Sequence, residues 1–372
     1  MYNTAMLKKI VSLKTDRRTL IKYVLLPGII TAFLLLGGVA LWRHISDPAD
    51  AFTEEDWHLY FDQKVVNIAL LGFDRTAARD KYYRLYRPDT IMIAAINLDQ
   101  KSVYIVNIPR DSYVKINGTE GYDKINHSYM YGHDRPGVAD PHRSGMETLL
   151  KTIEDFLGGI PVHYYVSLDM DGVAEIVDKL GGFYYDVDVE VRANMGRGRL
   201  LLEKGYQHLD GKKFLYYVRY RATGGDLERS QRQQQILIAA FRQLRTQGRL
   251  NELPGLYRTL KENVETNLSL RQISSLALFG TRVEPDTIKA YVFAGEMQYA
   301  PWGNIDALNF WVIDEKARVS LIKEIFGVNV APLPQISLPG PRKPEEPSEV
   351  EESPPPPSST EPLPSDHRQE IP

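Results

Sequence analysis

The middle of the chain alternates between short apolar runs and longer stretches in which apolar residues recur every three or four positions. The short runs, at residues 65–71, 90–96 and 102–108, have the length and composition of strands in a buried sheet. Residues 97–101, Asn-Leu-Asp-Gln-Lys, predict a hairpin-like connection between the second run and the third. The domain is therefore expected to begin with strands.

The helical stretches carry their own start and stop signals. Asp210 can cap one helix, Asp169 or Asp171 can start another, and glycine pairs follow two of them. We expect helices at about residues 146–157, 169–180, 211–218, 227–246, 256–265, 270–279 and 314–326, and further strands at 162–167, 183–189 and 288–294. Because strands and helices interleave, the predicted fold class is α/β, with a central mixed β-sheet sandwiched by helices.

The N-terminal region has a different pattern, that of a membrane anchor. Residues 23–42 contain no charged residue, and twenty such residues form a helix about 30 Å long, the thickness of the hydrocarbon core of a bilayer. Cations dominate residues 1–22 and acidic residues dominate the stretch after Arg43. The positive-inside rule then predicts a single-pass cell-membrane protein with a cytoplasmic N-terminus and an extracellular domain. A cleaved signal peptide is the alternative, although the apolar run is longer than usual for one.

The C-terminal region is rich in proline and glutamate. More than half of the 23 prolines lie beyond residue 331, where no aromatic residue occurs. Such a composition cannot bury enough apolar surface to fold and predicts a disordered tail. The predicted domain organisation is a cytoplasmic segment (1–22), a transmembrane anchor (23–42), a linker (43–60), a globular domain (61–330) and the tail (331–372).

Composition narrows the chemistry of the globular domain. The absence of cysteine excludes zinc fingers, iron–sulfur clusters, disulfides and thiol nucleophiles. A formal net charge of −3 argues against a nucleic-acid-binding protein, and no nucleic-acid partner is expected.

Two aspartates are candidates for a metal site. Asp74 follows the first strand and Asp89 precedes the second, so the two carboxylates can converge if these strands are neighbours. Paired carboxylates with open positions suit Mg²⁺, with Mn²⁺ as the alternative ion. Both aspartates could equally be ordinary turn residues at strand ends.

Arginines are concentrated at two further points, where they predict phosphate binding. Arg110 follows the third strand, where it needs either a carboxylate or a phosphate as partner. The second group lies on both sides of a Gly-Gly turn, and a helix N-terminus nearby adds attraction for anions. Its members are Arg219, Arg221, Arg229, Arg232 and Gln233. A solvated basic face is the other interpretation, and it accounts for Arg232 better than for Arg219 and Arg221. Asp226, between the two arginine pairs, is either a general base or a helix cap.

Six stretches, in order, resemble the LytR–CpsA–Psr (LCP) family of membrane-anchored cell-wall enzymes. They are VNIALLGFDR (66–75), RPDTIMIAAIN (87–97), VYIVNIPRDSYVKI (103–116), DKINHSYMYG (123–132), VHYYVSLDMDGVAEIVDKLGGFYYDV (162–187) and KGYQHLDGKKFLYYVRYRATGGDLERSQRQQQ (204–235). The resemblance implies an α/β domain with an apolar tunnel for a polyprenyl chain.

The resemblance also implies roles for individual residues. Asp74 and Asp89 match Mg²⁺-binding positions. Pyrophosphate-binding positions are matched by Arg75, Arg87, Arg110, Arg219, Arg221, Arg229 and Gln233, and we add Arg232 to this set. We expect Arg219, Arg221, Arg229 and Asp226 to be the catalytic residues. His127 matches a variable position and receives no role.

The implied activity is Mg²⁺-dependent transfer of a glycopolymer from a polyprenyl-diphosphate carrier to peptidoglycan, with release of polyprenyl phosphate. The partners are then the lipid-linked glycan and peptidoglycan, and the enzyme is a phosphotransferase. Two alternatives use the same features: a polyprenyl-diphosphate pyrophosphatase, and a non-catalytic envelope regulator or wall-binding protein. The second is disfavoured because about 22 cytoplasmic residues are too few for a DNA-binding domain.

Overall fold

The computed structural model describes most of the predicted globular domain: residues 60–74, 87–193, 197–221, 225–302, 305–334 and 337–338, without the side chains of 225, 226, 302, 305 and 306. The chain divides into a larger unit, residues 1–298 and 309–335, and a smaller one, residues 299–308 and 336–372. In the parts described, no helix is both long and apolar enough to cross a membrane. The predicted anchor at 23–42 lies outside the described residues, as do the linker, apart from residue 60, and nearly all of the tail.

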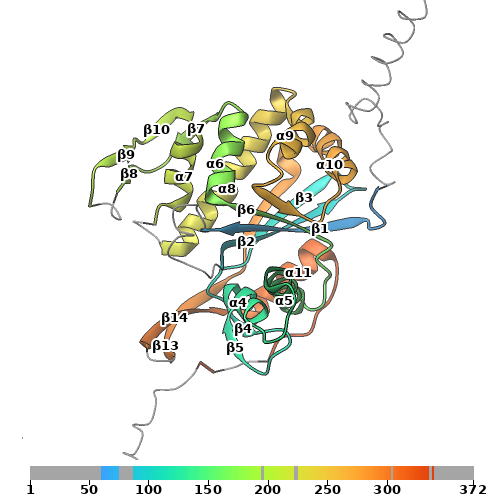
Figure 1. Ribbon diagram of the computed structural model, residues 1–372, viewed down its shortest axis with the longest axis vertical. Helices are drawn as coiled ribbons and strands as arrows, with labels where there is room; N and C mark the ends of the chain where they lie inside the picture. Colours follow the sequence, from blue (N-terminus) through green and yellow to red (C-terminus); the bar gives the residue numbers. More distant parts are fainter. Residues whose placement is uncertain are drawn as a thin grey trace, which may run out of the picture. The chain divides into compact units, whose positions relative to one another are not determined.

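A mixed sheet of six strands forms the centre of the larger unit, in the order β11-β6-β1-β2-β3-β12 (Figure 1). Neighbours pair antiparallel in β1–β2, β2–β3 and β6–β11, and parallel in β1–β6 and β3–β12. The strands are β1 (Val65–Phe73), β2 (Pro88–Asn97), β3 (Ser102–Asn107), β6 (Tyr164–Asp169), β11 (Val264–Thr266) and β12 (Ile288–Val292). The predicted mixed sheet and the hairpin-like connection between β2 and β3 are confirmed.

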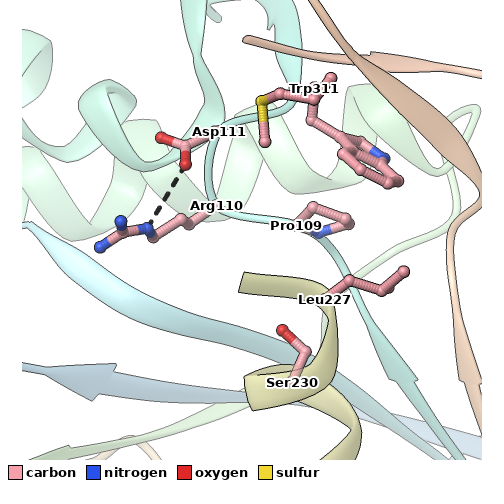
Figure 2. A pocket seen from close by; sticks show the side chains of 7 residues that line it. Pro109, Arg110, Asp111, Leu227, Ser230 and Trp311 are labelled. Carbon is pink, nitrogen blue, oxygen red and sulfur yellow. Dashed lines mark ion pairs between the residues drawn. The ribbon is translucent and has the colours of Figure 1, made fainter. Parts of the chain in front are cut away.

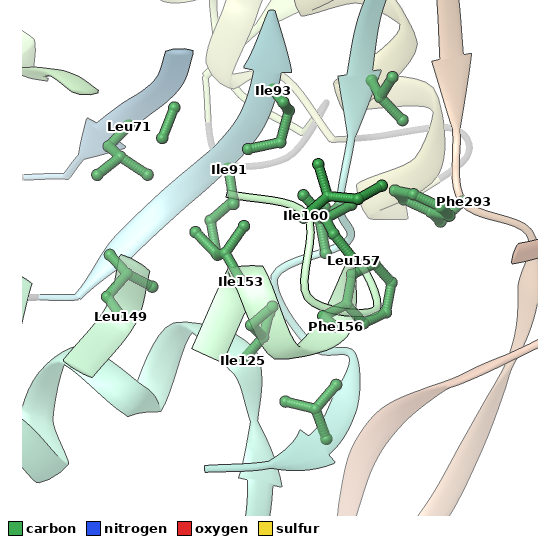
Figure 3. Packing of buried hydrophobic residues seen from close by; sticks show 14 of the residues in the cluster. Leu71, Ile91, Ile93, Ile125, Leu149, Ile153, Phe156, Leu157, Ile160 and Phe293 are labelled. Atoms are coloured by element: carbon green, nitrogen blue, oxygen red, sulfur yellow. The ribbon is translucent and has the colours of Figure 1, made fainter. Parts of the chain in front are cut away.

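Helices cover both faces of the sheet (Figure 1). One face packs on α8 (Gly225–Thr246) and α10 (Leu270–Arg282), and the other on α5 (Pro141–Phe156) and α11 (Glu315–Phe326). Successive strand residues point to opposite faces, which is why one strand contributes to both cores. In the α5 core, Leu71 and Ile93 of the sheet contact the layer that contains Leu149, Ile153 and Phe156 (Figure 3).

A third hydrophobic cluster lies among α6 (Met170–Lys179), α7 (Gly211–Arg219), β7 (Phe183–Val187) and β10 (Gly205–Leu209), and it includes Ile236 of α8. Two predicted caps start its helices. Asp169 Oδ1 accepts from the backbone N–H of Gly172 at 2.7 Å, and Asp210 Oδ1 accepts from that of Lys213 at 2.8 Å. Capping thus fixes where α6 and α7 begin, and Asp169 rather than Asp171 is the cap of α6.

Several elements differ from the sequence prediction. The helix expected at 256–265 is α9 (Leu253–Thr259), and β11 then joins the edge of the sheet. Asn263, just before β11, interrupts the apolar pattern of the expected helix. The three residues of β11 are too few to show the alternation of apolar and polar positions that identifies a strand. Besides β11, the elements that the pattern did not predict are β4 (Tyr113–Lys115), β5 (Tyr122–Lys124), η4 (Ile125–His127), α4 (Ser128–His133), β8 (Val191–Arg192), β9 (Leu200–Leu202), β10 (Gly205–Leu209), η5 (Leu250–Glu252), η6 (Pro285–Thr287), β13 (Gly295–Trp302) and β14 (Ile305–Ile313).

A buried arginine holds the last helix in place. The side chain of Arg318 is 0% exposed, and its Nη2 lies 2.9 Å from Glu315 one turn earlier in α11. The guanidinium group also donates to the carbonyl oxygens of Phe156, at 2.6 Å, and Ala331, at 3.1 Å. Arg318 therefore joins α11 to the end of α5 and to the segment that follows α11. We call Arg318, Glu315 and these two carbonyls the Arg318 node.

Candidate active site

The antiparallel ladder between β1 and β2 brings Asp74 and Asp89 to adjacent strands. Asp74 directly follows β1, and Asp89 is the second residue of β2. The register shifts where Phe73 pairs with Pro88, so that Asp89 is the extra residue of a β-bulge. The two aspartates are therefore neighbours because of strand pairing, as the sequence predicted.

Asp74 forms an ion pair with the last residue of α7. Arg219 Nη2 lies 3.1 Å from Asp74 Oδ1. The Arg219 side chain is 49% exposed and that of Asp74 is 25% exposed. Because exposed ion pairs contribute little to stability, this pair can be exchanged for a phosphate contact at low cost.

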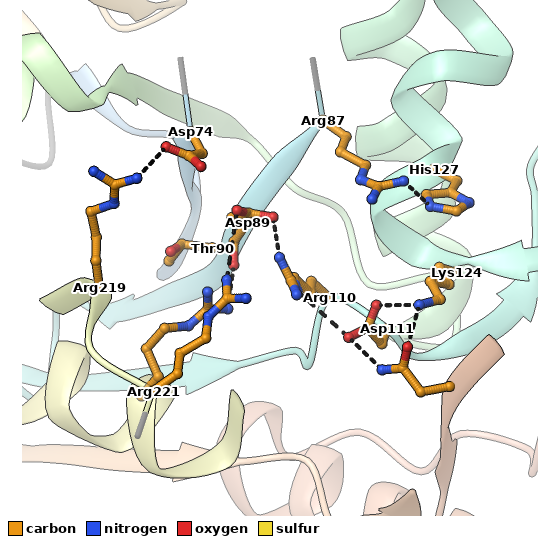
Figure 4. A network of polar contacts seen from close by, with 12 residues as sticks. Asp74, Arg87, Asp89, Thr90, Arg110, Asp111, Lys124, His127, Arg219 and Arg221 are labelled. Carbon is orange, nitrogen blue, oxygen red and sulfur yellow. Dashed lines mark hydrogen bonds and ion pairs between the residues drawn. The ribbon is translucent and has the colours of Figure 1, made fainter. Parts of the chain in front are cut away.

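Three arginines from different segments converge on Asp89 (Figure 4). Arg110, just after β3, donates to Oδ1 of the carboxylate. Arg221 Nη2 lies 3.8 Å from Oδ2, and Arg229 of α8 donates to the backbone carbonyl of Asp89 at 3.1 Å. Arg110, Arg221 and Arg229, which lie at two separate points of the sequence, thus surround one residue.

Arg229 and Gln233 lie one turn apart on the same face of α8, as their spacing predicted. Arg229 is buried. The hydroxyl of Thr90 lies 3.1 Å from Gln233 Oε1, and Gln233 Nε2 donates to the carbonyl of Val218 at 3.1 Å. Gln233 therefore connects α8 both to β2 and to the end of α7, which fixes Arg229 beside Asp89.

On its other side, Arg110 contacts a buried acidic group. Arg110 Nε lies 3.6 Å from Asp111 Oδ2, and Lys124 Nζ lies 2.8 Å from Asp111 Oδ1. Burial by itself raises the pKa of Asp111, but the hydrogen bond from Lys124 and the charges of Arg110, Lys124 and Arg87 lower it below its ordinary value. Arg110 thus has carboxylate partners, which the first interpretation of its sequence context expected, and phosphate binding by Arg110 stays a prediction.

The remaining predicted residues lie apart from this group. Arg87 contacts His127 rather than either aspartate. Arg232 has a side chain that is 5% exposed, donates to the carbonyl of Tyr220 and lies 3.5 Å from Glu228, which fixes the start of α8. It is therefore not on a solvated basic face, the alternative considered for it.

Two predicted residues, Arg75 and Asp226, are not part of the contacts described above. Arg75 and the side chain of Asp226 lie outside the described part of the chain. Asp226 belongs to the first turn of α8, which begins at Gly225, and not to the residue before the helix where a cap was expected.

Some residues of the site carried little signal in the sequence. Lys124, His127 and Asn309 were assigned no role, although Lys124 and Asn309 Nδ2, at 3.3 Å, both bind Asp111. Asn309 belongs to β14, which the hydrophobic pattern did not predict. The i,i+4 spacing of Asp123 and His127 was the only signal available for that pair.

The central group carries a local excess of positive charge. Among six described residues, four guanidinium groups (Arg110, Arg219, Arg221, Arg229) face two carboxylates (Asp74, Asp89). We call these six residues the arginine cluster. A diphosphate esterified at both ends carries about one negative charge per phosphoryl group, which matches this excess, and guanidinium groups bind phosphoryl oxygens in bidentate geometry.

The two aspartates also have the donor chemistry for a divalent ion. Carboxylate oxygens are ligands that Mg²⁺ prefers, and Mg²⁺ keeps water and substrate phosphate as its other ligands. Within the described ranges no three His, Cys, Asp or Glu side chains group as a metal site. The aspartates therefore fit a metal that is shared with a phosphorylated substrate, and its binding would compete with their ion pairs to Arg219 and Arg110.

Two cavities that share lining residues lie near Arg110 of the arginine cluster, and we call the larger one the groove. A small cavity of about 20 Å³ is lined by residues that include Arg110, Leu227 and Trp311 (Figure 2). Leu227 and Trp311 also line a larger open cavity of about 610 Å³ between α8 and β12, where Gln231 and Gln235 face it. The residues that line the larger cavity carry no charge. The apolar tunnel that the resemblance implies stays a prediction.

The sequence model of the LytR_cpsA_psr family matches residues 47–326. The chain belongs to the LytR–CpsA–Psr family. The predicted family is therefore confirmed, and so is the prediction that the protein is an enzyme of this family.

Named relatives within the LytR–CpsA–Psr family are transferases. The polyisoprenyl-teichoic acid–peptidoglycan teichoic acid transferase TagU of Bacillus mycoides is 30% identical over 261 residues, which cover 66% of this chain and 79% of TagU. TagU of Oceanobacillus iheyensis is 31% identical over 254 residues, 67% of this chain and 74% of TagU. TagT of Bacillus subtilis is 30% identical over 226 residues, 59% of this chain and 65% of TagT.

Solved structures agree with the fold. A structure of TagT bound to LIIa-WTA superposes with a TM-score of 0.54 and 27% identity, over 71% of this chain and 91% of TagT. B. subtilis TagV gives a TM-score of 0.57 and 25% identity, over 73% of this chain and all of TagV. The central mixed sheet flanked by helices is thus shared with LytR–CpsA–Psr structures.

Proposed function

We propose that this protein transfers a glycopolymer from a polyprenyl-diphosphate carrier to peptidoglycan and releases polyprenyl phosphate. The observation that carries the proposal is the convergence of Arg110, Arg219, Arg221 and Arg229 on two aspartates at one end of β1 and β2. The printed names of the relatives, which are teichoic acid transferases acting on peptidoglycan, agree with it.

The reaction needs charge neutralisation more than covalent help from the enzyme. A hydroxyl oxygen of the acceptor attacks the phosphorus that carries the glycan, and its proton passes to water. The P–O bond to the lipid phosphate breaks, and polyprenyl phosphate departs with the bonding electron pair. A phosphodiester between glycopolymer and peptidoglycan remains, and negative charge moves onto the leaving phosphate.

The arginine cluster supplies that neutralisation from rigid elements. Arg229 is buried and held beside Asp89, so little reorganisation is needed when charge develops. Arg219 and Arg221 are more exposed and can leave their carboxylates for phosphoryl oxygens. One donor of this kind is worth about 3 kcal/mol of activation free energy.

Asp74 and Asp89 would hold the divalent ion of the proposed reaction, Mg²⁺ or Mn²⁺. When bound, the ion adds positive charge against the phosphoryl oxygens. Arg219 and Arg110, which now bind these carboxylates, are thereby available to the substrate.

The groove beside the arginine cluster is suited to the glycan of the acceptor. Its uncharged lining offers amide groups from Gln231 and Gln235 and the ring of Trp311. A cavity of about 610 Å³ lies within the range of small-ligand sites and can hold a short saccharide. Because Leu227 and Trp311 border both cavities, an acceptor in the groove would extend toward Arg110.

The cellular location is part of the proposal. The uncharged run at 23–42, with cations before it and acidic residues after it, supports a single-pass cell-membrane anchor with the catalytic domain outside. A polyprenyl carrier and peptidoglycan would both be accessible to a domain in that position.

The test uses Arg219→Ala, with Arg242→Ala as the matched control. Both side chains are about half exposed, 49% and 52%, and both face one aspartate. With lipid-linked teichoic acid, Mg²⁺ and peptidoglycan, Arg219→Ala should lose transfer by about two orders of magnitude, and Arg242→Ala should not. Full transfer by Arg219→Ala would contradict the proposal. Release of free glycopolymer phosphate, with none joined to peptidoglycan, would identify a pyrophosphatase instead.

A further inference from the structure

The contact between Arg87 and His127 has no part in the reaction described so far. His127 ends the short helix η4, and its side chain is 14% exposed. Its Nδ1 lies 2.9 Å from Asp123 Oδ2, and its Nε2 lies 2.5 Å from Arg87 Nη1. Nδ1 thus has a negatively charged partner, and Nε2 has a positively charged one.

These partners determine the protonation of the ring. A carboxylate only accepts hydrogen bonds, so Nδ1 of His127 must donate to Asp123. A guanidinium group only donates, so Nε2 must accept from Arg87. The geometry therefore requires a neutral His127 with its proton on Nδ1.

Asp123 is itself held firmly. Its side chain is 5% exposed, and Oδ2 also accepts from the hydroxyl of Tyr131 at 3.2 Å. Its Oδ1 accepts from the backbone N–H of Lys124 at 2.7 Å. A fixed carboxylate fixes the imidazole, in the same way that carboxylates orient histidines in metal sites.

Arg87, unlike Asp123, is not held in place by burial. It is exposed and lies just before β2, two residues from Asp89. An arginine side chain loses considerable conformational entropy when it is ordered. Figure 4 shows its guanidinium group turned toward His127, on the side of Asp89 where Arg110 and Lys124 lie, opposite to Arg219.

We propose that Asp123 and His127 form a positioning pair that orders Arg87 for the phosphorylated donor. The inference rests on the proposed function, because it takes the donor to be a polyprenyl diphosphate. His127 holds the side chain of Arg87, two residues before Asp89, in one place before the donor arrives, so the entropy of ordering Arg87 is not lost during binding. His127 is a positioning residue and acts through Arg87.

The experiment measures binding of farnesyl diphosphate, a short polyprenyl diphosphate, to the full chain without acceptor. His127→Ala should weaken binding about fivefold. In the transfer assay with lipid-linked teichoic acid and peptidoglycan, the same variant should leave kcat at saturating donor within about twofold. His127→Gln can donate to Asp123 and accept from Arg87, so it should bind like the wild type. His133→Ala, at a histidine six residues further on whose side chain is 28% exposed, is the control and should change neither affinity nor kcat.

Three outcomes would overturn the positioning role. If Arg87→Ala weakens binding and His127→Ala leaves the affinity unchanged, the positioning role of His127 is refuted and the proposed function is not. Fully additive effects in Arg87→Ala/His127→Ala would show that the two residues act independently. Wild-type affinity with lost kcat in His127→Gln would make His127 a proton acceptor in the reaction. Unchanged affinity in Arg87→Ala and Arg219→Ala alike would instead contradict the proposed function.

Discussion

Arginine serves two different purposes in this molecule, at the Arg318 node and in the arginine cluster. At the node, one fully buried guanidinium group meets one carboxylate and two carbonyl oxygens. In the cluster, three guanidinium groups contact two carboxylates, a fourth donates to the backbone carbonyl of Asp89, and Arg219 and Arg221 are substantially exposed. In the node the charges are balanced and the guanidinium group is inaccessible to solvent, as expected for a group that stabilises the fold. The cluster holds surplus positive charge within reach of solvent, which suits an anionic ligand.

The largest expected effect comes from removing the buried member of the cluster. Arg229→Ala should lower kcat/KM for transfer by two to three orders of magnitude, about 3–4 kcal/mol, because it removes a fixed donor to the reacting phosphate. Transfer of lipid-linked teichoic acid to peptidoglycan measures it, and thermal unfolding verifies that the variant is folded. A folded Arg229→Ala variant with wild-type kcat/KM would contradict a role of the arginine cluster in transfer.

The reciprocal change at the node should act on stability. Arg318→Met leaves Glu315 without its ion-pair partner and two carbonyls without a donor, which should cost about 3 kcal/mol of unfolding free energy. Transfer per folded molecule should not change. Arg143→Ala breaks an exposed helical pair with Glu147 and is the control, with an expected cost below about 0.5 kcal/mol. Equal losses in both variants would show that burial of Arg318 is unimportant.

Asp111 lies between the two cases, buried like the node yet in contact with Arg110 of the cluster. Its pKa is lowered in the folded protein, so its contribution to stability is present above its unfolded pKa of 3.8 and is lost as the pH falls through the lowered value. Asp111→Asn should therefore cost about 1–3 kcal/mol at neutral pH, and the two unfolding curves should converge in strong acid. Asp134→Asn, at an exposed carboxylate, should show no such dependence. A constant difference at every pH would contradict this account.

The smallest expected effect is that of salt. Raising the ionic strength from about 0.05 M to about 0.5 M shortens the Debye length severalfold. Binding of farnesyl diphosphate to the exposed arginines should weaken severalfold, because each contact is screened. The melting temperature, which includes the buried node, should hardly change. Donor binding that is insensitive to salt would indicate that the tail, and not the diphosphate, dominates recognition.

Much of the fold could be predicted because its signals are local. Asp169 and Asp210 begin helices through hydrogen bonds to the third residue that follows, and the three apolar runs are adjacent strands. β11 and the β13–β14 pair were missed because they are short or lack alternation, and only tertiary pairing makes them strands.

The site was partly predictable for a related reason. Spacing placed Arg229 beside Gln233 and strand order placed Asp74 near Asp89, since both follow from regular geometry. Long-range partners could not be derived in this way: Lys124 and Asn309, which bind Asp111, come from segments 13 and 198 residues away.

The pairing of β1 with β2 has a practical consequence for engineering. Backbone hydrogen bonds of the ladder set Asp74 beside Asp89, so the number of residues that connect the strands does not position them. Insertions between paired strands cost little because closure entropy grows only slowly with length. The placement of Asp74 beside Asp89 should therefore tolerate a change in the length of the connection, because the sheet sets it.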